Sequence, residues 1–211
     1  HDARTKIDDA ERAPEGEAVR HAAALSASGF DHFTNYRIEA DGTIVMRNLV
    51  RPFGALDTLP RVGLRLFTVA DLENISWYGR GPGESYPDRK ASAQMGRYAS
   101  TVTMQNEHYV RPQEMGSKED TRYAVLTDSL GNGLWIGSDR PFAFSALHYT
   151  AEMLAETLHD GQLAPLKETV LSLDIKQNGL GNSSCGGDVM EQYRLHANEM
   201  AFMFKLRPVF S

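Results

Sequence analysis

The segment 77–89 combines residue types that could form a sugar-binding surface. Its sequence is Trp-Tyr-Gly-Arg-Gly-Pro-Gly-Glu-Ser-Tyr-Pro-Asp-Arg, so aromatic rings stand beside short polar and charged groups. Glycine permits positive φ or close approach of the backbone, and proline fixes φ, so the segment predicts a loop with a specified backbone. The composition fits a ligand contact and a structural loop, and we favour the structural role.

The three glycines of this segment have a spacing similar to a dinucleotide-binding fingerprint. That fingerprint requires a helix directly after the glycines, inside a strand–helix–strand unit. Two prolines in the segment interrupt any such helix. We therefore reject dinucleotide binding and predict a structural loop between sheets, in which Asp88 and Arg89 bind the backbone of that loop.

A second glycine-rich segment, residues 177–188, holds the single cysteine of the chain, Cys185. Four glycines among small polar side chains allow the backbone to approach a ligand closely. A cysteine nucleophile requires a histidine partner, and spacing indicates none. The alternatives for Cys185 are a compact group that lines a site and a buried thiol that packs as a small apolar residue.

Histidines and carboxylates give no catalytic or metal site by spacing alone. The seven histidines lack both zinc-site spacing and the H-E-x-x-H motif, so we predict no metal. His148 ends a predicted strand, where either a site or a purely structural histidine can lie. Glycoside hydrolysis needs two carboxylates that face each other across the sugar. No feature pairs any two of the candidates near loops, which are Glu84, Asp88, Glu114, Glu152 and Glu156, so we predict no catalytic residue.

Most of the chain after residue 30 has the alternating pattern of half-buried β-strands. Tyr36 and Ile38 alternate before Asp41-Gly42, a hairpin turn, and Ile44 resumes the alternation. A helical pattern occurs over 150–158, with Thr150 as the N-cap. Further strands are predicted over 62–66, 75–78, 98–104, 123–127, 134–137, 142–147, 171–175 and 202–206, with a hairpin turn at 130–133. Many short strands and one helix predict an all-β sandwich or barrel.

Residues 1–29 differ in composition from the rest, being rich in Ala, Glu, Asp and Arg. We predict short helical pieces near 7–12 and 17–24, within an N-terminal arm or connection that spans 1–29. Residues 30–211 are predicted to form a single β-sandwich domain. The chain begins without Met, a basic region or an apolar region, so we expect a piece of a longer protein.

The composition also limits the partners. The net charge of −6 and the isoelectric point of about 5.6 argue against a nucleic-acid partner, which requires a basic face. No apolar run approaches the roughly 18–20 residues of a membrane span, so we expect no membrane contact. A single cysteine excludes a disulfide within the chain.

Residues 77–89 resemble the W-x-G-x-G-P-x-E-x-Y-P-D-R segment in the C-terminal β-sandwich domain of β-galactosidases of glycoside hydrolase family 2. Further segments resemble the same domain in the same order, and together they cover about 33–207. They are 36–38 and 59–64 before this segment, then 109–116 with its Y-x-x-P-x-E-x-G pattern, then 142–149, 154–159 and 179–186.

The resemblance implies a large antiparallel supersandwich, as in galactose mutarotase-like proteins, that starts after the first strands of the family domain. It implies an accessory domain that completes the sugar site of a parent enzyme hydrolysing terminal β-galactosides. The catalytic glutamates would lie in an upstream barrel domain, so this chain alone would be inactive and would need no cofactor. The expected partners are the galactoside, the upstream domains and further copies of the chain, in the cytoplasm or periplasm of a bacterium.

The resemblance also suggests substrate-binding residues, namely Ser184, Cys185 and Gly186 in the second glycine-rich segment, together with His148. In some members of the family this segment carries a tryptophan that stacks on sugar, whereas this chain has Cys185-Gly186 there. Two alternatives remain: a free-standing carbohydrate-binding module with the mutarotase-like fold, and an aldose-epimerase relative that uses a carboxylate and a histidine as base and acid.

Overall fold

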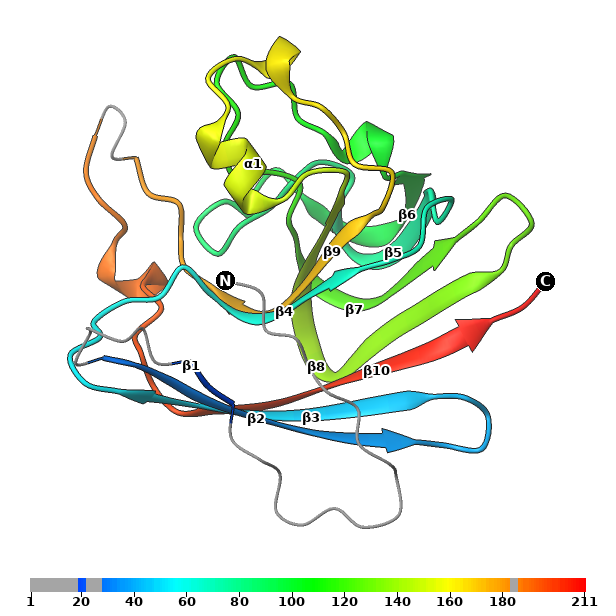
Figure 1. The fold of residues 1–211 in the computed structure, drawn as a ribbon. Helices are drawn as coiled ribbons and strands as arrows, with labels where there is room; N and C mark the ends of the chain where they lie inside the picture. The colour runs from blue at the N-terminus through cyan, green and yellow to red at the C-terminus, as the bar shows by residue number, and fades with distance from the viewer. Residues whose placement is uncertain (1–18, 22–27, 183–185) are drawn as a thin grey trace.

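The computed structural model describes residues 19–21, 28–182 and 186–211 of the chain. Ten strands and a single α-helix are the main elements of this part (Figure 1). The strands are β1 (Val19–His21), β2 (Gly29–Ile38), β3 (Ile44–Phe53), β4 (Arg61–Phe67), β5 (Asn74–Gly81), β6 (Gln94–Thr101), β7 (Lys118–Thr127), β8 (Gly133–Leu147), β9 (Val170–Gln177) and β10 (Met200–Val209), and the helix is α1 (Ala151–Glu156). Within the described residues, no helix has the length and apolar character that crossing a membrane would need.

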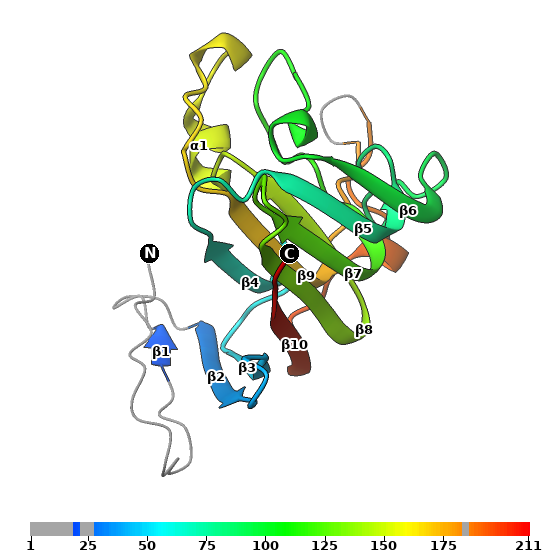
Figure 2. The ribbon, with the colours of Figure 1, turned by 90° about the vertical axis from the view of Figure 1, so that its right-hand side faces the viewer.

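All the strand pairings are antiparallel. The order is β1-β2-β3-β10-β8-β7-β5-β6, and β4 joins through β9, which pairs with β8. The continuous sheet folds over β8, so that β1, β2, β3 and β10 form one layer and β4, β9, β7, β5 and β6 the other (Figures 1 and 2). The predicted all-β antiparallel sandwich is therefore confirmed.

Strand β8 takes part in both layers. Its first part, from Gly133 to Ser138, pairs with β10, and its last part, from Ala143 to Leu147, pairs with β9. The sequence predicted two separate strands here, because an Asp-Arg-Pro run at 139–141 interrupts the apolar pattern. The registers of β8 skip these three residues, so Pro141 costs no ladder hydrogen bond and one strand of 15 residues continues through it.

The core lies between the two layers and is rich in aromatic rings. The rings of Phe142 and Phe204 have centroids 5.5 Å apart, and those of Phe202 and Phe204 are 5.8 Å apart. Trp77 lies 6.0 Å from Phe144 and 5.4 Å from Tyr98, measured between centroids. Edge-to-face and tilted ring pairs of this kind add to the stabilisation by apolar burial.

Local turn and cap signals predicted several elements correctly. Strands β2 and β3 form the expected hairpin, in which Gly42 has a φ of 81° and Asp41 Oδ1 accepts a hydrogen bond from the Thr43 amide at 2.9 Å. Thr150 caps α1, because its hydroxyl accepts a hydrogen bond from the Met153 amide at 3.2 Å.

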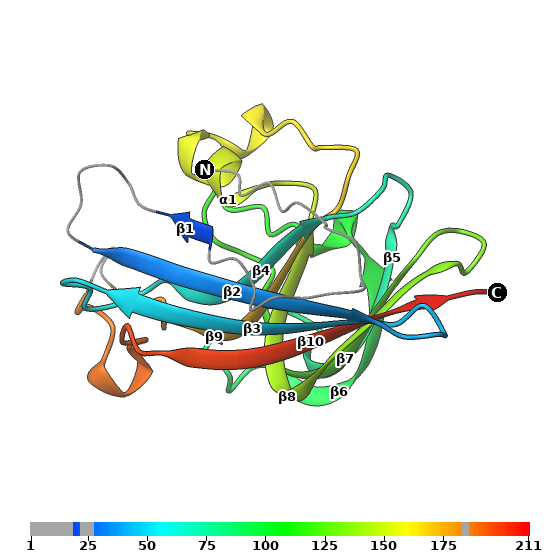
Figure 3. The same ribbon diagram turned by 60° about the horizontal axis from the view of Figure 1, so that its bottom comes forward.

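The N-terminal segment contributes a strand where a helix was expected. β1 pairs with β2 in the register Val19↔His32 and His21↔Phe30, so the helical piece predicted over 17–24 is wrong at these residues. The piece predicted over 7–12 lies outside the described residues. As Figure 3 shows, β1 lies along the outer edge of β2, where it gives partners to backbone groups that otherwise recruit foreign strands.

Candidate functional site

The glycines of segment 77–89 serve close packing of strands more than the shape of a loop. Gly79 and Gly81 lie inside β5. A Cβ on Gly79 would lie 2.6 Å from Thr121 Oγ1 and 2.9 Å from Thr121 Cα on the neighbouring strand β7. Gly83, in the loop itself, has no atom within 4 Å of such a Cβ. The strand pairing, and not a ligand, therefore requires glycine at position 79.

The loop that follows β5 is tied to the segment 109–116. The carboxylate of Glu84 accepts hydrogen bonds from the Tyr109 hydroxyl at 2.5 Å and from the Gly116 amide at 2.8 Å. Burial, together with the bond to Glu84, raises the pKa of Tyr109. Both oxygens of Glu84 are therefore used inside the protein, which gives this carboxylate a structural role.

Asp88 and Arg89 bind the part of the second glycine-rich segment that follows β9, residues 178–188, which we call the late loop. Asp88 Oδ1 accepts a hydrogen bond from the Leu180 amide at 3.1 Å, and Oδ2 accepts one from the Gly181 amide at 2.8 Å. Arg89 Nη2 donates to the Gly181 carbonyl at 2.9 Å. Our expectation that these side chains bind their own loop was wrong. They fix the backbone of a segment 92 to 93 positions further along the chain.

We expect Asp88→Ala to lower the free energy of unfolding by about 1–3 kcal/mol, because it leaves two amides of the late loop without acceptors. Asp88→Asn should have a smaller effect, since one amide oxygen can still accept. Urea unfolding measures both variants. Asp57→Ala is the matched control, because Asp57 is 82% exposed and its ion pair with His196 spans 3.7 Å. Equal midpoints for Asp88→Ala and Asp57→Ala would contradict the anchoring role.

The late loop is held at its base by hydrogen bonds to the segment that follows it. The Gly179 amide donates to the Tyr193 carbonyl at 2.9 Å, and Asn178 Oδ1 accepts a hydrogen bond from the Leu195 amide at 2.8 Å. Gly186, one of the predicted substrate-binding residues, is exposed, and its amide donates to the Asn182 carbonyl. The other two predicted residues of the tip, Ser184 and Cys185, lie outside the described residues.

His148 lies at the end of β8, before α1, where its ring is bound on both sides. Nδ1 is 3.0 Å from the Glu168 carbonyl oxygen, and Nε2 is 2.9 Å from Glu73 Oε2. Burial works against ionisation of Glu73, but hydrogen bonds from Thr103 and His148 still lower its pKa. With a protein partner on each nitrogen, His148 has no free ring atom for a sugar hydroxyl, which supports the structural alternative.

Glu114, one of the candidate carboxylates, shares an arginine with a buried aspartate. Arg61 lies between Glu114, at 2.6 Å, and Asp174, at 3.3 Å. Burial raises the pKa of Asp174 to about 6, although the Arg61 charge opposes that shift. The hollow beside Arg61 and Glu114 has a volume of only about 20 Å³. This volume is too small for a sugar ring, so these carboxylates do not form a glycosidase pair.

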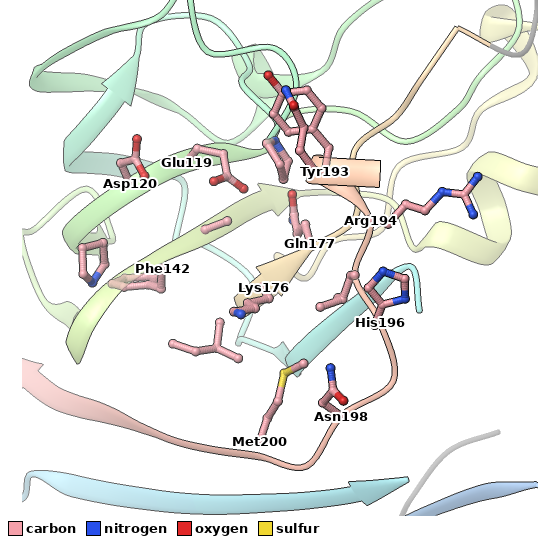
Figure 4. A pocket seen from close by; sticks show the side chains of 16 residues that line it. Glu119, Asp120, Phe142, Lys176, Gln177, Tyr193, Arg194, His196, Asn198 and Met200 are labelled. Carbon is pink, nitrogen blue, oxygen red and sulfur yellow. The ribbon is translucent and has the colours of Figure 1, made fainter. Parts of the chain in front are cut away.

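A larger pocket of about 430 Å³ opens beside the base of the late loop (Figure 4). Its walls come from positions 87, 119–120, 141–143, 175–177 and seven residues between 192 and 200. The sequence did not indicate this pocket, because segments that are far apart in the chain build it and no local pattern shows that they come together. Among the described residues, no three His, Cys, Asp or Glu side chains group to hold a metal ion.

The fold and these two interlocked segments define a class of protein, namely an antiparallel β-sandwich domain with a glycine-rich loop fixed by a second, charged loop. Residues 2–206 match the family model described as beta galactosidase small chain. The chain belongs to this family.

Relatives of known name agree with this assignment. The chain is 35% identical to a β-galactosidase of Staphylococcus xylosus over 173 residues, which are 82% of this chain and 17% of the relative. It is 38% identical to a β-galactosidase of Actinobacillus pleuropneumoniae over 81% of this chain and 16% of the relative. For a β-galactosidase of Arthrobacter sp. (strain B7) the identity is 32%, over 96% of this chain and 21% of the relative. The chain thus spans only about a fifth, or less, of the length of these relatives.

Proposed function

We propose that this chain is the accessory sandwich domain of a β-galactosidase, and that its late loop completes the sugar site of that enzyme. One observation carries the proposal. The charged residues at the end of the segment 77–89 fix the backbone of the late loop at Leu180 and Gly181, while Asn182 and Gly186, further along the loop, are exposed. A fixed base next to exposed residues is what a loop needs to present groups to a ligand on another domain.

Within this proposal, Ser184, Cys185 and Gly186 contact the substrate through small groups. Cys185 acts as a compact lining residue and not as a nucleophile, since no base is assigned to it. The catalytic carboxylates belong to another domain of the parent polypeptide. Glu114 borders a hollow of only about 20 Å³, and Glu119 and Asp120, which line the larger pocket, are consecutive residues on one wall and do not face each other across it. The parent's substrate would be a terminal β-galactoside.

The test is made in an enzyme that contains this chain. We expect Cys185→Trp and Cys185→Ala to change kcat/KM on a chromogenic β-galactoside by about 3–10-fold, a free-energy difference of about 1 kcal/mol. The change should be mainly in KM, because the loop contributes to substrate binding and the catalytic residues belong to another domain.

Asp57→Ala, on an exposed side chain, is the control in the same enzyme, and the 211-residue chain alone should show no turnover. Identical kinetics for the wild-type protein and both Cys185 variants would remove the late loop from the site. Turnover by the chain alone would contradict an accessory role.

A further inference from the structure

The pocket of about 430 Å³ beside the late loop has the features of an independent ligand site. We propose that it binds a neutral, polyhydroxylated ligand, a monosaccharide or disaccharide, separately from any sugar held at the tip of the late loop. The volume lies within the roughly 300–1,000 Å³ typical of small-molecule sites.

One side of the pocket is apolar and rigid. Phe142 and Leu195, which are 2% and 4% exposed, belong to the buried core and form part of the wall. Tyr193 is half-buried, and its backbone is fixed on both sides, since its amide donates to the Met190 carbonyl and its carbonyl accepts from Gly179, both at 2.9 Å. An aromatic ring in the lining of a pocket suits the apolar face of a sugar.

The polar side of the pocket is formed by Glu119, whose side chain points toward the centre in Figure 4. This residue is only 9% exposed, and its Oε2 lies 3.0 Å from Lys90 Nζ. Its other carboxylate oxygen has no hydrogen bond with any described residue. This oxygen is not among the buried atoms that lack a partner, and it is available to accept a hydrogen bond from a ligand hydroxyl.

The charge behind this wall is balanced. Lys90 contacts both Glu119 and Asp120, at 3.0 and 2.9 Å, and Arg80 Nε donates to Asp120 at 2.5 Å. Two cations therefore face two carboxylates. This balance leaves no excess negative charge on that wall for a cationic ligand, while Lys176, elsewhere in the lining, is available as a hydrogen-bond donor.

Other groups at the pocket could bind the remaining hydroxyls. Lys176 and Asn198 are exposed, lie on the opposite side from Tyr193 in Figure 4, and form no side-chain hydrogen bond with described residues. Gln177 is different, because Asp174 and Ser117 occupy both ends of its amide, at 2.8 and 3.0 Å. An apolar ligand would leave the Glu119 carboxylate unsatisfied, so the set of groups fits a polyol best.

The pocket is distinct from the late loop. Its lining includes no residue from 178 to 188. Arg194 separates the two, because its guanidinium points away from the pocket in Figure 4, and its Nη2 donates to Asp188 at 3.3 Å. The lining residues named here all belong to this chain, so sugar binding at the pocket can be tested separately from the proposed role in a parent enzyme.

Sugar binding is tested on the ¹⁵N-labelled 211-residue chain by NMR titration with galactose and with lactose. We expect saturable shifts of the amides at Gln177, Tyr193 and Asn198, with a dissociation constant on the order of 1 mM for a ligand of this size. Tyr193→Ala and Glu119→Gln should each weaken binding by about tenfold. Tyr78→Ala is the matched control, since Tyr78 is exposed on β5 and packs against Tyr123, away from the pocket.

Thermal unfolding and spectral dispersion of each variant show whether it is folded, and Tyr193→Phe provides a milder change that keeps the ring. The proposal is overturned if neither sugar shifts the pocket amides at about 100 mM, far above a millimolar constant. It is also overturned if sulfate binds there in place of sugar. Shifts confined to residues 179–187 would place the sugar at the late loop, which supports the proposed function and rejects the pocket.

Discussion

Replacing Trp77 with alanine should destabilise the domain by about 3–5 kcal/mol, which is a large part of the stability of an ordinary domain. Trp77 is 2% exposed and packs against the rings of Tyr98 and Phe144. Its indole N–H donates to the Arg80 carbonyl at 2.9 Å, and the buried ammonium of Lys118 lies 5.6 Å from its ring centroid. The substitution would remove all these contacts and leave a cavity in the core.

Urea unfolding followed by circular dichroism measures this loss. Trp135→Ala is the matched control, since Trp135 is only half-buried and stacks under Arg207 at 5.0 Å from its ring centroid. We expect its cost to be about 1 kcal/mol. The chain has just these two tryptophans, so the fluorescence of the control variant reports on Trp77 alone. Equal losses for the two variants would show that the aromatic core does not dominate stability.

Gly63→Ala should also destabilise strongly, by about 3 kcal/mol. At Gly63, next to a register shift between Val62 and Gly63, β4 lies very close to β9. A Cβ at Gly63 would lie 2.1 Å from the Leu173 carbonyl oxygen and 2.6 Å from Asp174 Oδ1. The first clash is with backbone, so it cannot be relieved by rotating a side chain and requires the two strands to move apart.

Gly83→Ala is the control for this clash, because a methyl group at position 83 would have no atom within 4 Å. Its effect should stay within about 0.5 kcal/mol, with a small gain from the reduced entropy of the unfolded chain. A comparison of thermal midpoints separates the two glycines. If Gly63→Ala unfolds at the same temperature as Gly83→Ala, the close approach of β4 and β9 is wrong.

Signals within a few residues predicted the local elements well. The Asp41-Gly42 turn between alternating apolar residues was enough to predict the β2–β3 hairpin, and Thr150 was enough to predict the start of α1. Such features depend on one turn or one cap, whose chemistry is fully contained in the local sequence.

Features that depend on tertiary contacts could not be predicted from the sequence. Asp88 was correctly expected to bind backbone amides, but no local pattern indicates that its partners lie in the late loop. The polar run before Phe142 predicted a break where β8 continues, because the sequence does not show that its neighbours skip those positions. The pocket was missed for the same reason, since Glu119 and Tyr193 come to line the same pocket only after the sheet has folded.

Strand β8 belongs to both layers of the sandwich, so one strand joins the layers directly. In a sandwich of two separate sheets, connecting loops and packed side chains join the halves, and no strand belongs to both sheets. Here a covalent backbone crosses from one layer to the other, with ladder hydrogen bonds to β10 at one end and to β9 at the other. The layers cannot slide or open independently, so their slowest amide hydrogens should exchange as one cooperative unit. When such a domain moves as a rigid body, its late loop keeps a fixed position relative to the rest of the domain.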